Sequence, residues 1–295
     1  MKFLASTLTT LALALTLASS PARAGDPFRT TNPRPISADT QAAFELMFKQ
    51  GDYPSASKQL DRALRSDPSE PLAQSLKASL AYIEQDFQGM LIYARRTRDR
   101  AEQLKAKDKL RGHLYSGVGY LIEAGHAVST QGLFSGTAQA LGLVQKVLDE
   151  IKSAQAVNDQ DPELNLIKGY MDMLIASVLP LADLEGALGS LRRSGPAYLK
   201  YRGIALGYRD AKRATEALEA VDQAIAAAPE NPELLYLKGQ ILWQKGDNLD
   251  LAKQFYIQAL AKAKQIPPNT LRQINSECTT LAGNDCLVSP PQAVK

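Results

Sequence analysis

The chain has 295 residues, of which 45% are hydrophobic, 22% charged and 6% aromatic. This composition is that of a globular protein and excludes a disordered or collagen-like chain. The 34 Lys and Arg residues include Lys2 and Arg23, whose removal with the segment described next would leave 32 against 31 Asp and Glu residues. A net charge so close to zero argues against nucleic acid as a partner.

Residues 1–24 are typical of a secretory signal peptide. Lys2 gives a positive start, residues 3–17 are apolar and uncharged, and Ala22-Arg23-Ala24 places small residues where signal peptidase reads them. The alternative is a membrane anchor, but the apolar run is shorter than the ~20 residues that span a bilayer. We therefore predict cleavage after Ala24 and secretion across the inner membrane into the periplasm or an equivalent lumen. The mature chain would be soluble, without a transmembrane anchor.

Residues 25–37 contain Pro27, Pro33 and Pro35, which predict an extended leader rather than a folded element. After the leader, self-similarity is the strongest pattern. Residues 161–169, DPELNLIKG, recur 70 residues later at 231–239 as NPELLYLKG, and PAYLKYRG lies halfway between. Proline suits the first turn of a helix. Because glycine inside a helix costs about 1 kcal/mol relative to alanine, its repeated use indicates closely packed helices.

The residues between these marks predict a second amphipathic helix in each unit. Turns such as Gly51-Asp52-Tyr53 precede it, and Asp67-Pro68 ends one of these helices. Small residues recur at a spacing of seven, which places them on one helix face: Ala56 and Ala63, Ala217 and Ala224, Ala252 and Ala259.

The period near 34, the Gly-Asp-Tyr turn, the Ala-x3-large-x2-Ala helix and the closing Asp-Pro resemble the tetratricopeptide repeat (TPR). The resemblance is good over 40–70 and 196–264 and weaker over 71–105. It is poor over 109–195, where we expect long loops at 129–137, with Phe134 at the tip as a candidate partner contact, and at 178–182.

This resemblance implies an all-α, right-handed TPR-like solenoid of about six helical hairpins, completed by a C-terminal capping helix. The predicted divisions are a solenoid over 38–266 that is irregular over 109–195, a capping segment over 267–288 and a disordered tail over 289–295. The predicted hairpins cover 37–70, 71–108, 109–160, 161–195, 196–231 and 232–266.

Both cysteines, Cys278 and Cys286, lie in the capping segment. In an exported chain so close a pair most simply forms a structural disulfide, which would stabilise the cap by roughly 2–3 kcal/mol. The alternative is a redox-active pair, but such pairs are more often separated by two residues and lie at a helix start.

The sequence offers no constellation that points to catalysis. His113 and His126 are too far apart to share one turn of a helix as metal ligands. No Gly-x-Ser-x-Gly turn and no phosphate-binding loop are present in the sequence. We therefore predict that the protein is not an enzyme and has neither a cofactor nor a metal.

The TPR resemblance implies that the first helix of each hairpin lines a concave groove, which receives a peptide or a helix. Aromatic rings combined with a basic residue and an amide suit peptide recognition. The alternative is that several of these rings belong to the core between repeats. The candidate groove residues are Tyr170, Lys200, Tyr201, Tyr208, Tyr236, Gln240 and Trp243.

A second candidate surface is a basic patch, defined as Arg95, Arg96, Arg98 and Arg100. Residues three or four apart share a helix face, so the patch could bind an acidic peptide, an anionic lipid surface or an anionic polymer. The alternative is a solvated helix face whose arginine stems cover apolar atoms.

The predicted function is a non-catalytic scaffold or adaptor of the periplasm or cell envelope that binds a partner peptide or protein in its concave groove. The alternative is a ligand-binding accessory protein of an uptake system, which holds a small or lipid-like molecule in the irregular middle repeats. An enclosed apolar cavity over 109–195 would favour the alternative, and an open groove would favour the scaffold.

Overall fold

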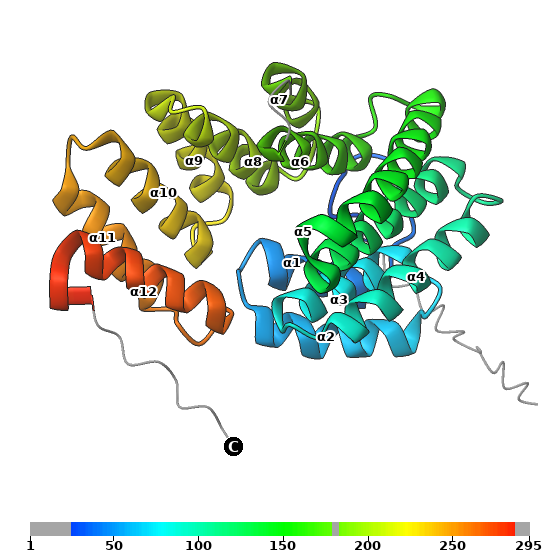
Figure 1. Ribbon diagram of the computed structural model, residues 1–295, viewed down its shortest axis with the longest axis horizontal. Coiled ribbons are helices and arrows are strands. Elements are labelled where there is room, and N and C mark those ends of the chain that lie inside the picture. Colours follow the sequence, from blue (N-terminus) through cyan, green and yellow to red (C-terminus); the bar gives the residue numbers. More distant parts are fainter. Residues whose placement is uncertain (1–24, 179–182, 287–295) are drawn as a thin grey trace, which may run out of the picture.

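The computed structural model describes residues 25–178 and 183–286, and within these ranges the regular structure is entirely helical (Figure 1). None of the described helices is long and apolar enough to cross a membrane. The helices are α1 (Ala38–Phe48), α2 (Tyr53–Ser66), α3 (Pro71–Ile83), α4 (Phe87–Leu104), α5 (Lys109–Val157), α6 (Pro162–Val178), α7 (Leu184–Arg192), α8 (Ala197–Asp210), α9 (Ala214–Ala227), α10 (Pro232–Lys245), α11 (Leu249–Leu260), α12 (Pro268–Ala282) and the short 3-10 helix η1 (Gly283–Cys286).

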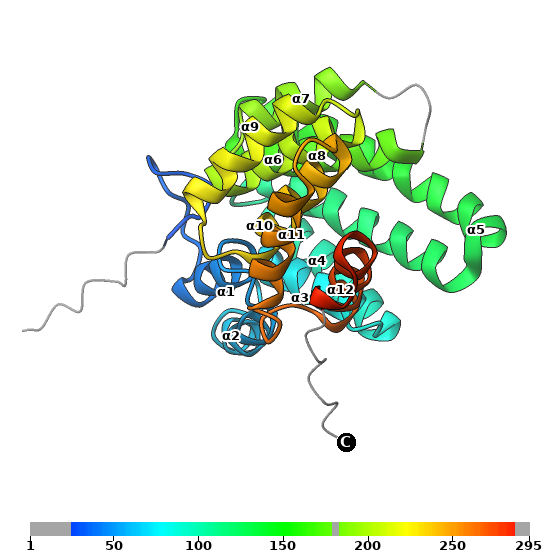
Figure 2. The ribbon, with the colours of Figure 1, turned by 90° about the vertical axis from the view of Figure 1, so that its left-hand side faces the viewer.

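Consecutive helices pack in pairs: α1 with α2, α3 with α4, α6 with α7, α8 with α9 and α10 with α11. The pairs follow one another along a curved path, and α12 covers the last pair (Figures 1 and 2). A hairpin of two helices cannot bury its apolar face alone, so each leans on the next. The predicted all-α helical-hairpin solenoid with a capping helix is thus confirmed.

The repeated glycines and alanines mark the close contacts between helices. A Cβ atom at Gly169 would lie 2.6 Å from Leu191 Cγ, and one at Gly239 would lie 2.9 Å from Tyr256 Cδ2. The six alanines that recur at a spacing of seven in the second helices are all fully buried: Ala56, Ala63, Ala217, Ala224, Ala252 and Ala259. The glycines therefore occupy positions where any side chain would push two helices apart, as the repeat pattern predicts.

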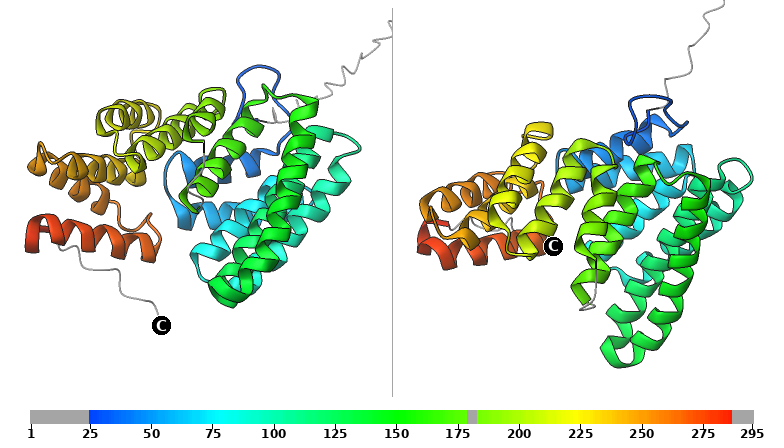
Figure 3. Two further views of the ribbon diagram at one scale, coloured as in Figure 1. Left: turned by 45° about the horizontal axis from the view of Figure 1, so that its top comes forward. Right: turned by 90° about the horizontal axis from the view of Figure 1, so that it is seen from above.

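Helix α5 corrects the prediction of a long loop over 129–137. Its backbone is helical on both sides of Gly132, whose φ of 76° and ψ of 172° interrupt the helix. The two arms run side by side: Gln131 Nε2 donates to Gln139 Oε1 at 3.0 Å near the turn, and His113 Nδ1 lies 2.6 Å from Glu150 Oε2 farther along the arms. Glycine adopts a positive φ without steric cost, so a single residue reverses the chain. The resulting hairpin is the third of the solenoid and projects beyond its neighbours (Figure 3).

Four sequence predictions lie outside the described residues. They are the signal peptide at 1–24, the side chain of Phe134, the loop at 178–182 beyond its first, helical residue, and the C-terminal tail at 289–295.

The leader, residues 25–37, contains no helix, yet it packs against the hairpins. Phe28 and Ile36 are buried, and the Phe28 ring meets the Phe44 ring edge-on with 5.0 Å between centroids. A Cβ atom at Gly195 would lie 2.6 Å from the Phe28 carbonyl oxygen. The leader therefore touches both α1 and the start of the fifth hairpin, a packing that the proline-rich sequence did not predict.

Buried ion pairs extend the contacts of the leader to α5 and α6, and a further pair joins α5 to α3. The carboxylates of Glu70, Asp108 and Asp161 cap the first turns of α3, α5 and α6 by accepting backbone N–H groups. Three arginines bind these caps and their neighbours. The pairs are Arg29 with Asp26 and Asp161, Arg34 with Asp108, Asp161 and Glu163, and Arg111 with Glu70 and Glu163.

The last hairpin contacts the first hairpin. Asn231 Nδ2 donates to the Phe48 carbonyl oxygen at 2.9 Å, and the Tyr53 hydroxyl donates to Glu233 Oε1 at 3.0 Å. The Tyr53 backbone N–H donates to the Gln265 carbonyl oxygen at 3.1 Å. These contacts close the curved path into a ring, which brings α2 near the segment that precedes α12 (Figure 1).

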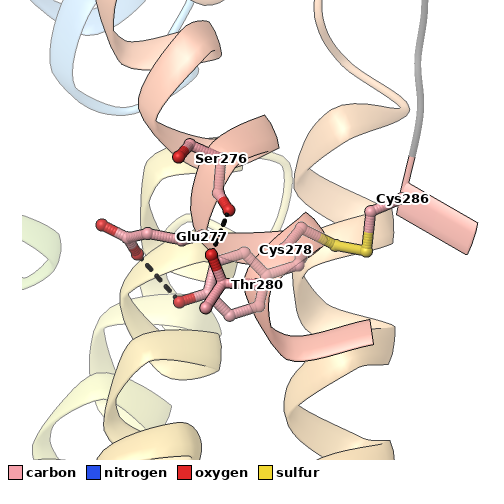
Figure 4. The surroundings of a disulfide bond; sticks show 6 residues. Ser276, Glu277, Cys278, Thr280 and Cys286 are labelled. Carbon is pink, nitrogen blue, oxygen red and sulfur yellow. Dashed lines mark hydrogen bonds between the residues drawn. A yellow bond between two sulfur atoms is a disulfide. The ribbon is translucent and has the colours of Figure 1, made fainter. Parts of the chain in front are cut away.

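The cap consists of α12 and η1. Cys278 and Cys286 are joined by a disulfide, with 5.6 Å between their Cα atoms (Figure 4). Glu277 attaches the cap to the last hairpin, because it accepts hydrogen bonds from Tyr236 and Tyr256 at 2.8 and 2.9 Å. Hydrophobic packing, a disulfide and hydrogen bonds thus hold the end of the solenoid together.

Candidate binding groove

Two depressions lie side by side on the inner face of the ring. The apolar depression, of about 490 Å³, is formed by the leader, α1, α3, α5, α6 and α8. The polar depression, of about 550 Å³, is formed by α8, α10 and α12. Arg202 lines both, so the two depressions meet at this residue. Together they make up the groove.

The apolar depression is built from first-helix side chains at helical spacing. Leu72 and Leu76 line it from α3, Leu121 and Ile122 from α5, and Met171 from α6. Its hydroxyl groups all donate to internal acceptors. They are Ser75 to the Leu72 carbonyl (2.8 Å), Ser79 to the Ser75 carbonyl (3.0 Å), Tyr115 to Glu163 (2.7 Å) and Tyr170 to the Leu199 carbonyl (2.8 Å).

Arg202 places a positive charge where the two depressions meet. Its side chain is 27% exposed, and its Nη2 atom lies 3.8 Å from Glu233 Oε2. Burial lowers the pKa of Arg202, but the attraction of the Glu233 carboxylate and the interactions with neighbouring tyrosine hydroxyls, chiefly Tyr170, together outweigh burial and raise this pKa above its usual value. The guanidinium is therefore permanently charged; it interacts with the Tyr170 hydroxyl and lies beyond hydrogen-bond distance of Glu233.

The polar depression is organised around Glu277. This carboxylate accepts hydrogen bonds from Tyr236, Gln240 and Gln273, at 2.8, 2.9 and 2.9 Å. Burial raises the pKa of Glu277, but these donors favour the carboxylate and bring its pKa below the usual value. Trp243 lies beside this cluster on α10. The depression therefore combines a fixed negative charge with amide groups and aromatic edges.

The structure divides the predicted groove residues into two groups. Tyr236, Gln240 and Trp243 line the polar depression, and Tyr170 lines the apolar depression. The remaining three residues line neither. Lys200 Nζ lies 5.8 Å from the centroid of the Tyr201 ring, and the Tyr208 ring stacks with the Arg213 guanidinium at 4.5 Å.

The four arginines of the basic patch point to different surroundings. Arg95 and Arg96 are exposed on α4. Arg98 donates to Glu123 on α5 at 2.8 Å, and Arg100 donates to Gln103 at 3.1 Å. Arg98 therefore belongs to the contact between α4 and α5, while Arg95 and Arg96 face solvent.

Sequence reasoning missed the walls of the apolar depression and Arg202. One available signal was the spacing of Leu72 and Leu76, and of Ile167 and Met171, which puts each pair on one helix face. Such a spacing does not distinguish a face packed against the next hairpin from one that lines a groove. Only the curvature of the solenoid separates these two environments.

Comparison with known proteins agrees with this architecture. A family model described as tetratricopeptide repeat matches residues 42–103 and 202–265. The match to this family model therefore falls in both halves of the ring. The two matched segments cover the first two hairpins and most of the last two hairpins, and they leave out α5 to α7, where the sequence departs from the repeat pattern.

Among solved structures, the chain is similar to a thermophilic TPR protein from Thermus thermophilus. The identity is 18% and the TM-score 0.31, and the match covers 82% of this chain and 96% of that chain. No match is found among the curated proteins.

Proposed function

We propose that the protein is a non-catalytic TPR scaffold or adaptor that holds a segment of a partner protein in the groove. The observation that carries this proposal is the junction of an apolar and a polar depression on one inner face. The apolar part supplies burial, worth about 25 cal/mol per Å² of apolar surface removed from water. The polar part supplies orientation, as polar groups beside an apolar centre do at protein interfaces.

The proposal includes export to the periplasm or an equivalent compartment of the cell envelope. Two observations support it: the signal-like residues 1–24 and the cysteine pair at disulfide distance. Disulfides persist mainly in oxidising compartments. The test is N-terminal sequencing of the protein from fractionated cells. We expect a mature chain that begins at Gly25 in the envelope or periplasmic fraction, and a chain retaining residues 1–24 in the cytoplasm would contradict export.

The groove carboxylates support a binding role over a catalytic role. Glu233 accepts from Tyr53, and Glu277 accepts from several neutral donors, so both serve contacts within the fold. A catalytic acid or base needs a pKa near the working pH, whereas the pKa of Glu277 is lowered away from neutrality.

A second candidate, the binding of a lipid-like molecule, is favoured by one observation. The apolar depression takes in residues of the irregular middle, among them Leu121, Ile122 and Ile167. The depression also includes side chains of α1 and α3, so its extent goes beyond the middle hairpins. This breadth supports a macromolecular partner as the first candidate.

Site-specific photocrosslinking in cells tests the scaffold proposal. A photoreactive residue at Ile122, in the apolar depression, is compared with one at Ile257, which is 40% exposed on α11 and lines neither depression. We expect a discrete crosslinked protein from position 122 only. Equal crosslinking from both positions, or crosslinking from 257 alone, would overturn the assignment of the groove. Native mass spectrometry that finds a stoichiometric lipid would favour the second candidate.

A further inference from the structure

The walls of the apolar depression offer little to a peptide backbone. All four of its hydroxyl groups already donate to acceptors within the protein. The backbone groups of the lining helices are bonded along those helices. An extended peptide would therefore bury N–H and C=O groups without partners, which costs free energy comparable to that of lost hydrogen bonds.

An α-helix does not have this difficulty, because its backbone groups are satisfied within the helix. Apolar side chains at positions i, i+3, i+4 and i+7 form a stripe that can fill an apolar groove. The other face of such a helix stays polar and in water, which suits a depression that opens to solvent. An acyl chain in the same place would leave one side exposed.

Arg202 adds charge complementarity at one end of this depression. Its guanidinium is 3.8 Å from the nearest Glu233 oxygen, beyond hydrogen-bond distance. Glu233 in turn accepts from the Tyr53 hydroxyl, which contributes to the closure of the ring. An acidic side chain of a bound partner could approach Arg202 and form the shorter contact that Glu233 does not make.

From these observations we infer that the apolar depression receives an amphipathic α-helix of the partner protein, with an acidic residue beside Arg202. The inference rests on the proposed function and specifies the conformation and the charge of the bound segment. An extended peptide and a free fatty acid are the two competing occupants.

Two labelled peptides of identical composition test the conformation. One is a lactam-bridged helix of 18 residues with Leu at i, i+3, i+4 and i+7 and one Glu beside the stripe. The other carries the same residues with Leu at every second position, so that the apolar face requires an extended chain. Fluorescence anisotropy with the full mature protein should show at least ~10-fold tighter binding of the helical peptide, a difference of about 1.4 kcal/mol. Equal or tighter binding of the extended peptide would overturn the inference.

Matched variants test the place of binding. Ile122→Gln changes a half-buried side chain of the depression, and Ile257→Gln makes the same change on the outside of α11. We expect Ile122→Gln to weaken the helical peptide by ~10-fold or more and Ile257→Gln to leave it unchanged. Circular dichroism melts of both variants establish that each is folded. An unchanged affinity of folded Ile122→Gln would place the helix elsewhere and overturn the inference.

A double-mutant cycle tests the charge. Arg202→Gln in the protein is combined with Glu→Gln in the helical peptide. Because removal of either partner abolishes the same contact, the second change should cost little once the first is made. Additive losses would show that the acidic residue does not meet Arg202.

Palmitate separates failure of this inference from failure of the proposed function. If the extended peptide binds better than the helical one, a protein partner remains and only the helical conformation is wrong. If palmitate binds and neither peptide does, both the inference and the scaffold proposal are wrong. If none of the three binds at 100-fold excess over the protein, the assignment of the apolar depression as a binding site is wrong.

Discussion

Hairpins one to four and the last two hairpins with their cap are held together by different chemistry. In the first region, buried arginines pair with carboxylates far away in the sequence: Arg29 and Asp161 are 132 residues apart. In the second region, a disulfide between residues eight apart closes a loop within the cap, and the neutral donors Tyr236 and Tyr256 attach the cap to the last hairpin through Glu277. The comparison shows that buried charged contacts between residues distant in the sequence link the first four hairpins, whereas the cap on the last hairpin relies on neutral hydrogen bonds and a local disulfide.

The inner faces of the two regions also differ in polarity. In the first region, the buried charged side chains lie at the starts of the helices. The inner face beside Phe28 and Leu121 is apolar. The second region carries Glu277 and Gln240 on its inner face. One groove thus has two chemically distinct parts, and the region that depends on buried charges is the one with the apolar wall.

The largest expected effect is that of Glu163→Gln. Glu163 is fully buried and accepts from Arg34, Arg111 and Tyr115, at 2.8, 3.2 and 2.7 Å. Removing one partner of a buried ion pair leaves uncompensated charge, so we expect a loss of about 3–5 kcal/mol in the free energy of unfolding. Urea denaturation measures this change in the free energy of unfolding.

The matched control is Glu216→Gln, which also lies in the first turn of a helix and pairs with an arginine, but at the surface. The urea midpoint of Glu216→Gln should equal that of the protein without substitutions. A similar midpoint for both variants would show that burial of the charges does not distinguish the two regions.

The second-largest effect is expected for the double replacement Cys278→Ser and Cys286→Ser. Loss of the short covalent loop should lower the stability of the cap by about 2–3 kcal/mol on the chain-entropy model. Hydrogen exchange measured by mass spectrometry should show faster exchange over 268–286 and unchanged exchange over 38–83. Faster exchange throughout the ring would mean that the cap is not a local element. A thiol count on the denatured, unmodified protein should find no free thiol.

A smaller effect, about 1–2 kcal/mol, is expected for Asn231→Asp. The new carboxylate can still cap α10 by accepting the Glu233 N–H, but it cannot donate to the Phe48 carbonyl. Small-angle scattering should show a larger radius of gyration, because the contact that closes the ring is weakened. Asn248→Asp, at the surface cap of α11, is the control and should leave the radius unchanged. An unchanged radius for Asn231→Asp would show that this contact does not hold the ring closed.

The pH dependence sharpens the comparison further. Burial raises the pKa of Glu163, but the positive charges of Arg111 and Arg34 outweigh it, so this pKa is lowered, as is that of Glu277. A lowered pKa means that the stabilisation is complete above the unfolded value, about 4.3 for Glu, and is lost as the pH falls through the folded value. Urea denaturation between pH 7 and 3 should show this loss, with a shallower slope in Glu163→Gln. Parallel curves for the two proteins would contradict a role of Glu163 in acid unfolding.

Local sequence patterns predicted the hairpins well for a physical reason. Glycine at 169 and 239 and alanine at 56 and 63 report contacts between helices that are neighbours in the chain. The proximity of Cys278 and Cys286 in the sequence likewise limits where each can find a partner. The loop predicted at 129–137 was wrong because one residue, Gly132, turns the chain, and a departure from the repeat consensus does not reveal how short a turn is.

By itself, the sequence determined that paired helices recur, that they stack and that a cap covers the last pair. These properties depend on residues within one or two repeats of each other. Only the tertiary structure decided that the leader is packed against the fourth hairpin, that Asn231 meets Phe48 and that apolar and polar depressions share Arg202. Small rotations between successive hairpins add up along the chain, and this sum sets which distant side chains meet.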